Sequence, residues 1–246
     1  MSARPLVRSL AVLAAVIAAI AIPAIQMTQN IGLTAAEFSG QGDQTLRVAG
    51  YAFSIWGLIY FGLAAYAIYQ LTVARETPTL RAVAWPSVVA IAGCGAWILA
   101  SAFNQQWLSI AIIVTSAGAM VAGLRRARAD APSPAFRDKL LIVWPLSLLA
   151  GWLTIASAVN ILTVLTAQGI IGPDLPWAAI GIAAVLLVGG AVGWALRAPL
   201  YLAPIIWGLA GVYVAEQADQ PTAAWLAAAA ALLLALEAAA ILRKGR

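Results

Sequence analysis

The chain has 246 residues, of which 63% are apolar and only 9% are charged. A soluble globular domain usually carries about 25% charged residues, so this composition excludes a water-soluble fold and indicates an integral membrane protein. The formal net charge of +5 at pH 7 is attributed to cytoplasmic loops that contact anionic lipid. Nucleic-acid binding would require a larger folded basic surface, so no nucleic-acid partner is expected.

Apolar runs long enough to cross a bilayer recur eight times, since about 20 apolar residues make one spanning helix. The sequence predicts spans near residues 7–25, 50–73, 83–103, 107–124, 140–167, 177–196, 199–216 and 222–242. The seventh is short, and Pro199 and Pro204 interrupt its start. The expected fold class is therefore all-α: a polytopic integral membrane helical bundle of about eight transmembrane helices.

Basic residues test this assignment, because Lys and Arg concentrate in cytoplasmic loops. With a cytoplasmic N-terminus, only Arg47 of the fourteen basic residues falls outside. The other thirteen fall inside: Arg4, Arg8, Arg75, Arg81, Arg125, Arg126, Arg128, Arg137, Lys139, Arg197, Arg243, Lys244 and Arg246. Acidic residues fall mostly outside, at Glu37, Asp43, Asp174, Glu216 and Asp219. The pattern predicts a multi-pass membrane protein with both termini in the cytoplasm.

The first span also has features of a cleaved signal peptide. "MSARPLVRSLAVLAAVIAAIAIPA" begins with basic residues, continues with an apolar run and ends in small residues. Its apolar run is longer than a usual signal core and continues to Ile25, which favours a retained helix. Cleavage would leave seven spans and the same assignment of the remaining loops.

Few side chains are suited to catalysis or metal binding. The chain has no His and a single cysteine, Cys94, which excludes a His-based metal site, imidazole ligation of haem and an intramolecular disulfide. We expect no enzymatic activity, no metal site and no obligatory cofactor. Glu237 is the one candidate for a charge within a span; it has either a structural or interfacial role near Arg243 and Lys244, or serves as a proton or cation site.

Aromatic side chains form a ridge in the second span. In "FSIWGLIYFGLAAYAIY", residues 53–69, the residues Phe53, Trp56 and Tyr60 follow at steps of three and four, which places them on one face of a helix. Two interpretations remain open for the ridge: one wall of an intramembrane ligand pocket, or aromatic packing in the core.

Two further spans combine Trp with Asn. Trp97 and Asn104 share a face of the third span by the same spacing, and Trp152 and Asn160 lie eight residues apart on the fifth. An amide in lipid requires a partner, so both Asn side chains are expected to point into the bundle. Tryptophan rings with a few inward amides are typical of a pocket for a flat, largely apolar ligand.

Three of these segments resemble the TspO/translocator-protein (TspO/MBR) family of tryptophan-rich sensory proteins. "SIWGLIYFGLAAYAIY" is similar to the family's second helix, "FNQQW" to its Asn-x-x-Trp motif at Asn104 and Trp107, and "WLTIASAVN" to its Trp-to-Asn spacing at Trp152 and Asn160. The resemblance covers about residues 5–165. The chain departs from the family at Ser54, where Pro is usual, and at Ala111–Ile112, where two Phe are usual.

The resemblance implies a TspO-like five-helix core at residues 1–167 followed by three additional transmembrane helices at 168–246, as in a long, divergent bacterial branch. It also implies a cavity covered by the loop 26–49. The implied binding residues are Phe53, Trp56, Tyr60, Trp97, Asn104, Trp107, Trp152 and Asn160.

Family members bind porphyrins, other tetrapyrroles and in some cases sterols, without an axial protein ligand. The implied function is a membrane receptor or sensor that holds a porphyrin, or a similar lipophilic molecule, non-covalently. A transporter of such a lipophile and a non-catalytic structural subunit remain as alternatives. The expected partners are the lipid bilayer and the lipophilic ligand, with homo-oligomerisation or assembly into a larger membrane complex left open.

Overall fold

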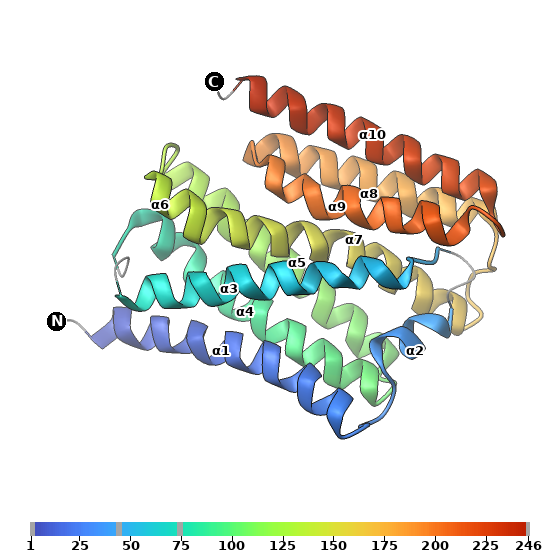
Figure 1. Cartoon of the computed structure of the whole chain (residues 1–246), viewed down its shortest axis with the longest axis horizontal. Coiled ribbons are helices and arrows are strands. Elements are labelled where there is room, and N and C mark those ends of the chain that lie inside the picture. The colour runs from blue at the N-terminus through green and yellow to red at the C-terminus, as the bar shows by residue number, and fades with distance from the viewer. Residues whose placement is uncertain (1–2, 43–45, 73–75, 245–246) are drawn as a thin grey trace.

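A computed structural model describes residues 3–42, 46–72 and 76–244 of the chain (Figure 1). Within these ranges the protein forms eight helices long and apolar enough to cross a membrane. They are α1 (Ala3–Thr28), α3 (Ile55–Thr72), α4 (Pro78–Ala102), α5 (Gln106–Asp130), α7 (Trp144–Ala167), α8 (Leu175–Leu196), α9 (Pro199–Glu216) and α10 (Pro221–Lys244). The predicted all-α membrane bundle with eight spans is confirmed.

Four short elements complete the described part of the chain. A short helix, α2 (Ala35–Gly40), and a 3₁₀ turn, η1 (Gly50–Ser54), lie between α1 and α3. The short helix α6 (Phe136–Asp138) and a π-helical turn, η2 (Lys139–Val143), lead into α7. No strand occurs in the described ranges.

Helix α9 occupies the predicted range 199–216, whereas several other helices, among them α4 and α5, extend beyond their predicted ends. Helix α4 begins at Pro78, because the Thr77 hydroxyl accepts a hydrogen bond from the Leu80 amide (3.2 Å) and Pro suits the first helical turn. Helix α5 continues to Asp130 through Arg125, Arg126 and Arg128. The charges that marked the end of the apolar run therefore lie on the same helix, beyond its apolar part.

Helix α7 lies at the centre of the bundle. It packs against α3 and α5 of the N-terminal part and against α8 and α9 of the C-terminal part, and α10 covers α8 and α9 (Figure 1). At the α7–α9 contact, a Cβ on Gly151 would lie 2.0 Å from the carbonyl oxygen of Tyr201. The Tyr201 hydroxyl is hydrogen-bonded to that of Thr154 at 2.8 Å. Helix α9 is thus closely packed on α7, and α10 packs on α8 and α9.

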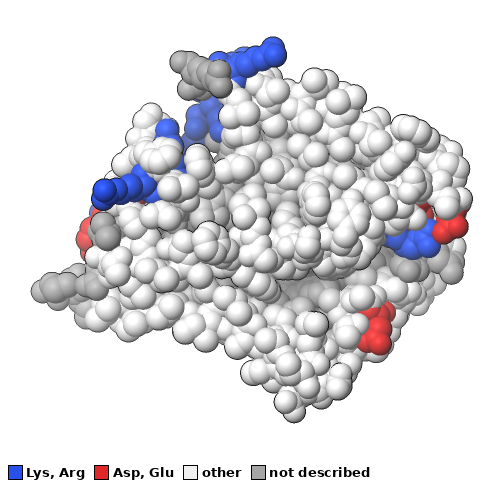
Figure 2. Space-filling view, viewed as in Figure 1, with Lys and Arg blue, Asp and Glu red and all other residues white. Residues whose placement is uncertain are grey.

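Charged residues lie at the two ends of the bundle. On the face of the molecule drawn in Figure 2, the Lys, Arg, Asp and Glu side chains lie at the two ends of the bundle, and the surface between them is uncharged. Both described ends of the chain lie on one side (Figure 1), as an even number of spans requires. Asp43, Arg75 and Arg246, on which the topology prediction also rested, lie outside the described residues.

The arrangement predicts which residues share a side of the membrane. In a Cys94→Ala background, Ser133→Cys and Arg243→Cys should react with a membrane-impermeant maleimide from one side of sealed vesicles. Gln105→Cys and Gln217→Cys, in exposed turns at the opposite ends of their helices, should react only from the other side. Labelling of Ser133→Cys and Gln105→Cys from the same side would contradict the eight-span bundle.

Candidate functional site

A cavity of about 540 Å³ lies in the bundle near the end opposite the two termini. It is lined by the last turns of α1 and α4, the start of α3, the middle and C-terminal part of α7, and residues of α5 and α9. Figure 2 shows the molecular surface hollowed between α3 and the α1–α2 pair. The cavity is therefore an intramembrane site that is open toward one flank of the bundle.

Aromatic rings form one wall of the cavity. Trp56 stacks on Tyr60, with ring centroids 5.1 Å apart, and Trp152 meets Trp56 edge-on at 6.3 Å. Phe53, in the 3₁₀ turn before α3, also meets Trp152 edge-on, at 6.2 Å. All four rings line the cavity. The ridge predicted from the sequence is thus both packed against α7 and exposed to the cavity.

Trp97 lies on another wall and has an unused hydrogen-bond donor. Its ring lines the cavity and packs edge-on against Phe38 of α2, with centroids 5.8 Å apart. Its indole Nε1 is buried and has no hydrogen-bond partner among the described residues. A buried N–H without a partner is costly, particularly in a bilayer. The group is therefore available to an acceptor atom of a ligand.

Asn160 combines a place in the cavity wall with a structural contact. It is buried, lines the cavity, and donates from Nδ2 to the Ser109 hydroxyl of α5 at 3.0 Å. Ser109 in turn donates to the carbonyl of Gln106 at 2.6 Å. The amide points into the bundle as expected, and its hydrogen bond joins α7 to α5.

Asn104 and Trp107 do not lie with the other predicted site residues. Helix α4 ends at Ala102, so Asn104 follows it in a turn, exposed and with φ of 53°. Asn tolerates this left-handed conformation better than most residues do, and its expected inward orientation was wrong. Trp107 is 55% exposed at the start of α5, as in an interfacial anchor. The helical spacing used for Asn104 fails because the helix has already ended.

The segment between α1 and α3 covers the cavity. Residues of α2 and of the following linker line it: Ala35, Ala36, Ser39, Gly40, Leu46, Arg47 and Val48. Thr34 and Glu37 form a reciprocal cap at the start of α2, with the Thr34 amide 2.7 Å from a Glu37 carboxylate oxygen. These hydrogen bonds lower the pKa of Glu37. The described part of the predicted covering loop is thus an ordered helix and linker.

Close backbone contacts hold this covering segment in place. A Cβ on Gly42 would lie 2.1 Å from the Thr163 carbonyl oxygen of α7, and one on Gly32 would lie 2.2 Å from that of Ala102. The Leu33 amide donates to the same Ala102 carbonyl at 3.0 Å. Both glycines permit the covering segment to approach a helix more closely than a side chain would allow.

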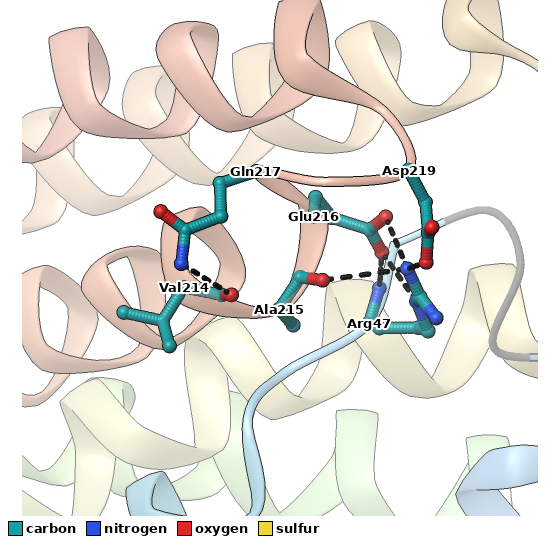
Figure 3. Close-up of polar contacts among 6 residues, drawn as sticks. All are labelled: Arg47, Val214, Ala215, Glu216, Gln217 and Asp219. Atoms are coloured by element: carbon teal, nitrogen blue, oxygen red, sulfur yellow. Dashed lines mark hydrogen bonds and ion pairs between the residues drawn. The ribbon is translucent and has the colours of Figure 1, made fainter.

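Arg47 joins the covering segment to the end of α9 (Figure 3). Its backbone amide donates to Glu216 Oε1 at 2.6 Å, and its guanidinium donates to both oxygens of the same carboxylate, each at 3.2 Å. It also contacts Asp219 and the carbonyl of Ala215. The side chain of Glu216 is fully buried. The hydrogen bonds to Glu216 raise the pKa of Arg47, so the guanidinium stays protonated.

The profile of the TSPO-like protein family matches residues 9–240 of this chain. The chain belongs to the TSPO-like protein family. Members of this family are polytopic membrane helical bundles and are generally not enzymes. No curated protein and no solved structure shows significant similarity to the chain.

Family membership extends the predicted resemblance in one respect. The sequence motifs cover about residues 5–165, whereas the TSPO-like match continues to residue 240 and includes α8, α9 and α10. The contacts agree with this wider unit, because Gly208 and Ala215 of α9 line the cavity. Helix α9 therefore contributes to the cavity wall of this TSPO-like protein as well as to its packing.

Charged groups within the spans give no sign of a metal centre. In the described part of the chain, no three His, Cys, Asp or Glu side chains lie together in a group that could hold a metal ion. Glu237 is partly buried, with Oε1 lacking a hydrogen-bond partner and Oε2 close to Gly190 of α8. Its predicted alternatives, an interfacial role or a proton or cation site, both remain predictions.

The Arg47–Glu216 pair was not predicted, although both residues carried a signal. Arg47 is the one basic residue expected on the outer side, and Glu216 closes an apolar span on that side. The Ser109–Asn160 hydrogen bond and the Phe38–Trp97 contact were missed because each joins elements far apart in sequence. The small residues of α2 gave no compositional signal of lining a site.

We expect the Arg47–Glu216 pair to keep the cavity covered. Arg47→Gln would leave the buried Glu216 carboxylate with only the backbone amide as partner. This should lower the free energy of unfolding by about 2–3 kcal/mol. The thermal unfolding midpoint in detergent should fall by several degrees, and proteolysis within residues 26–49 should accelerate.

Asp219→Asn is the matched control, since the Asp219 side chain is 65% exposed. Asp219→Asn should lower the free energy of unfolding by less than about 1 kcal/mol and leave the protease pattern unchanged. Equal effects of the two substitutions would show that the buried carboxylate is not what holds the covering segment.

Proposed function

We propose that this TSPO-like protein is a membrane receptor or sensor that binds a flat, largely apolar ligand of the tetrapyrrole class in the aromatic cavity. The observation that carries the proposal is the orientation of the Trp56, Tyr60 and Trp152 rings toward one covered cavity that also contains the unpaired Nε1 of Trp97. Packing alone would explain the ring contacts, but it leaves the cavity and the unused donor without a role.

The size and chemistry of the cavity fit such a ligand. Its volume of about 540 Å³ lies within the roughly 300–1,000 Å³ typical of small-molecule sites. Aromatic faces stabilise a planar ring by stacking and by excluding water. Trp97 supplies a donor to an oxygen of a polar substituent, and Arg47 lies at the rim with its charge already paired to Glu216. The site therefore favours a ring with few polar substituents.

The ligand proposed is held without a bond from the protein to a metal. The chain has no His, and the Cys94 thiol, which lines the cavity, donates to the Ala90 carbonyl within its own helix at 3.2 Å. Binding would rest on shape, stacking and the Trp97 donor. A metal-free porphyrin meets these conditions.

We further propose the bacterial inner membrane as the location, with both termini in the cytoplasm. The described basic residues other than Arg47 belong to the side of the termini, and an excess of Lys and Arg is typical of the cytoplasmic side. The aromatic cavity then lies in the outer half of the bilayer, where a lipophile can enter from the outer leaflet.

Replacing the aromatic wall should weaken binding of protoporphyrin IX to the purified protein. Trp56→Leu and Trp152→Leu should each lower the binding free energy by about 0.5–1.5 kcal/mol, which is what an aromatic contact contributes beyond area burial. The dissociation constant, measured by porphyrin fluorescence, should rise roughly three- to tenfold. Trp97→Phe keeps an aromatic ring at this position but removes the N–H donor, so it should lower porphyrin affinity more than it lowers the unfolding midpoint.

Two substitutions outside the cavity serve as controls. Trp225→Leu and Asn104→Ala lie in exposed positions away from the cavity lining and should leave the dissociation constant unchanged. Asn160→Ala should lower the unfolding midpoint first, because it breaks the contact with Ser109. The receptor proposal fails if Trp56→Leu and Trp152→Leu both destabilise the bundle while porphyrin affinity stays the same.

A further inference from the structure

A second cavity, of about 1150 Å³, lies at the opposite end of the bundle, on the side of the two termini. The end of α5, the start of α7 and the last turn of α10 contribute to its wall, together with the turn between α8 and α9. This cavity shares no lining residue with the aromatic cavity. It is therefore a separate site, and its ligand is a separate question.

Four basic residues from four parts of the chain meet at this cavity. Arg128, Lys139, Arg197 and Lys244 line it, and its lining contains no Asp or Glu. None of the four has an ion pair among the described residues. Lys244 instead lies over the ring of Trp194, with Nζ 4.5 Å from the centroid. The cavity thus has an excess of positive charge that the described part of the protein does not neutralise.

A helix N-terminus also lies at this cavity. Ala198, the residue before α9, and Pro199 and Leu200, its first residues, line the cavity, and a helix N-terminus carries partial positive charge. Arg197 precedes them in a left-handed conformation, with φ of 47°, at a helix end where Gly is usual. A strained Arg at this position suggests that its side chain, which lines the cavity, has a function.

One deeper group in the cavity lacks a partner. Ser147 of α7 is 1% exposed, lines the cavity, and its hydroxyl has no hydrogen-bond partner in the described structure. Trp144, Leu124, Ile206 and Ile241 line the same cavity. The cavity thus combines basic side chains, an apolar wall and one buried hydroxyl, which are the kinds of group that the phosphate, acyl chains and ester region of a membrane lipid would contact.

We propose that this cavity binds an anionic phospholipid from the leaflet on the side of the termini. The phosphate lies among the four basic side chains, the ester region meets the Ser147 hydroxyl, and the acyl chains lie along the apolar wall. Basic pockets between spanning helices on the cytoplasmic side are suited to such headgroups. The apolar wall favours a lipid over a free phosphate compound.

General membrane topology does not account for the cluster. The positive-inside bias requires basic residues on this side but does not require them to meet in one cavity. Arg125, Arg126, Arg137 and Arg243 satisfy the same bias from exposed positions outside the cavity lining. They provide matched controls for a test of the cluster.

The test is native mass spectrometry of the purified full chain in a neutral detergent, titrated with palmitoyl-oleoyl phosphatidylglycerol or with the corresponding phosphatidylcholine. Phosphatidylglycerol should bind selectively. The double substitution Arg128→Gln/Arg197→Gln should weaken it at least about tenfold, as expected for losing two charge contacts. Arg125→Gln/Arg126→Gln should leave the affinity within about twofold of the parent protein.

Ser147→Ala separates a ligand contact from a structural one. Because the hydroxyl has no protein partner, its removal should not lower the unfolding midpoint of lipid-free protein, yet it should weaken phosphatidylglycerol binding about fivefold. Protoporphyrin affinity at the other cavity should be unchanged in all these variants, which keeps this test independent of the proposed receptor function.

Three results would overturn the proposal. Equal binding of phosphatidylcholine would show that the headgroup charge is not recognised. Equal weakening by the Arg125/Arg126 control pair would show a general surface effect rather than a site. Displacement of the lipid by inorganic phosphate or glycerol 3-phosphate at millimolar concentration would identify a site for free phosphate instead of a lipid.

Discussion

A fully buried carboxylate at the end of α9, Glu216, constrains the half of the bundle that lies away from the two termini. Glu216 stands where the helix dipole is unfavourable to an anion, and the apolar surroundings add a large desolvation cost. Arg47 offsets both through its backbone amide and its guanidinium. Arg47 belongs to the segment that covers the aromatic cavity. Its ion pair with Glu216 therefore also determines where that segment lies.

The same contact explains why the C-terminal helices matter to the site. Beyond the ion pair, the Ala49 amide donates to the carbonyl of Gly211 at 3.0 Å, and the Trp207 indole donates to the carbonyl of Ala52 at 2.9 Å. A Cβ on Gly211 would come within 2.9 Å of Val48. Helix α9 therefore supports the backbone that enters α3, and with it the position of the Phe53–Trp56–Tyr60 ridge.

Most of the fold can be predicted from the sequence because the bilayer restricts the length and polarity of a spanning segment. Each span must be apolar and about 20 residues long, and charges lie beyond its apolar part, so the apolar runs locate eight helices. Eight binding residues are predicted from the sequence. Six of them line the cavity in the structure: Phe53, Trp56, Tyr60, Trp97, Trp152 and Asn160. These six lie within or beside regular helices, where residue spacing indicates which side chains lie on the same face of the helix.

Prediction fails where the helical repeat ends or where the contact is distant in sequence. Asn104 lies two residues past the end of α4, so its spacing from Trp97 no longer describes a face. The Arg47–Glu216 contact spans 169 positions, and neither residue belongs to a local pattern. The choice between packing and pocket could not be made from the sequence either, because Trp56 does both: one part of its ring contacts Trp152 while another faces the cavity.

Helix α7 shows how polar groups are divided between structure and ligand in this bundle. Thr154 is paired with Tyr201, and Asn160 with Ser109, so these groups hold α7 to α9 and α5. Ser147 of the same helix has no such partner and lines the basic cavity, as the unpaired indole N–H of Trp97 lines the aromatic one. A bilayer offers almost no water to satisfy such groups. We propose that ligands supply the missing partners of these two groups, a planar lipophile at Trp97 and an anionic lipid at Ser147.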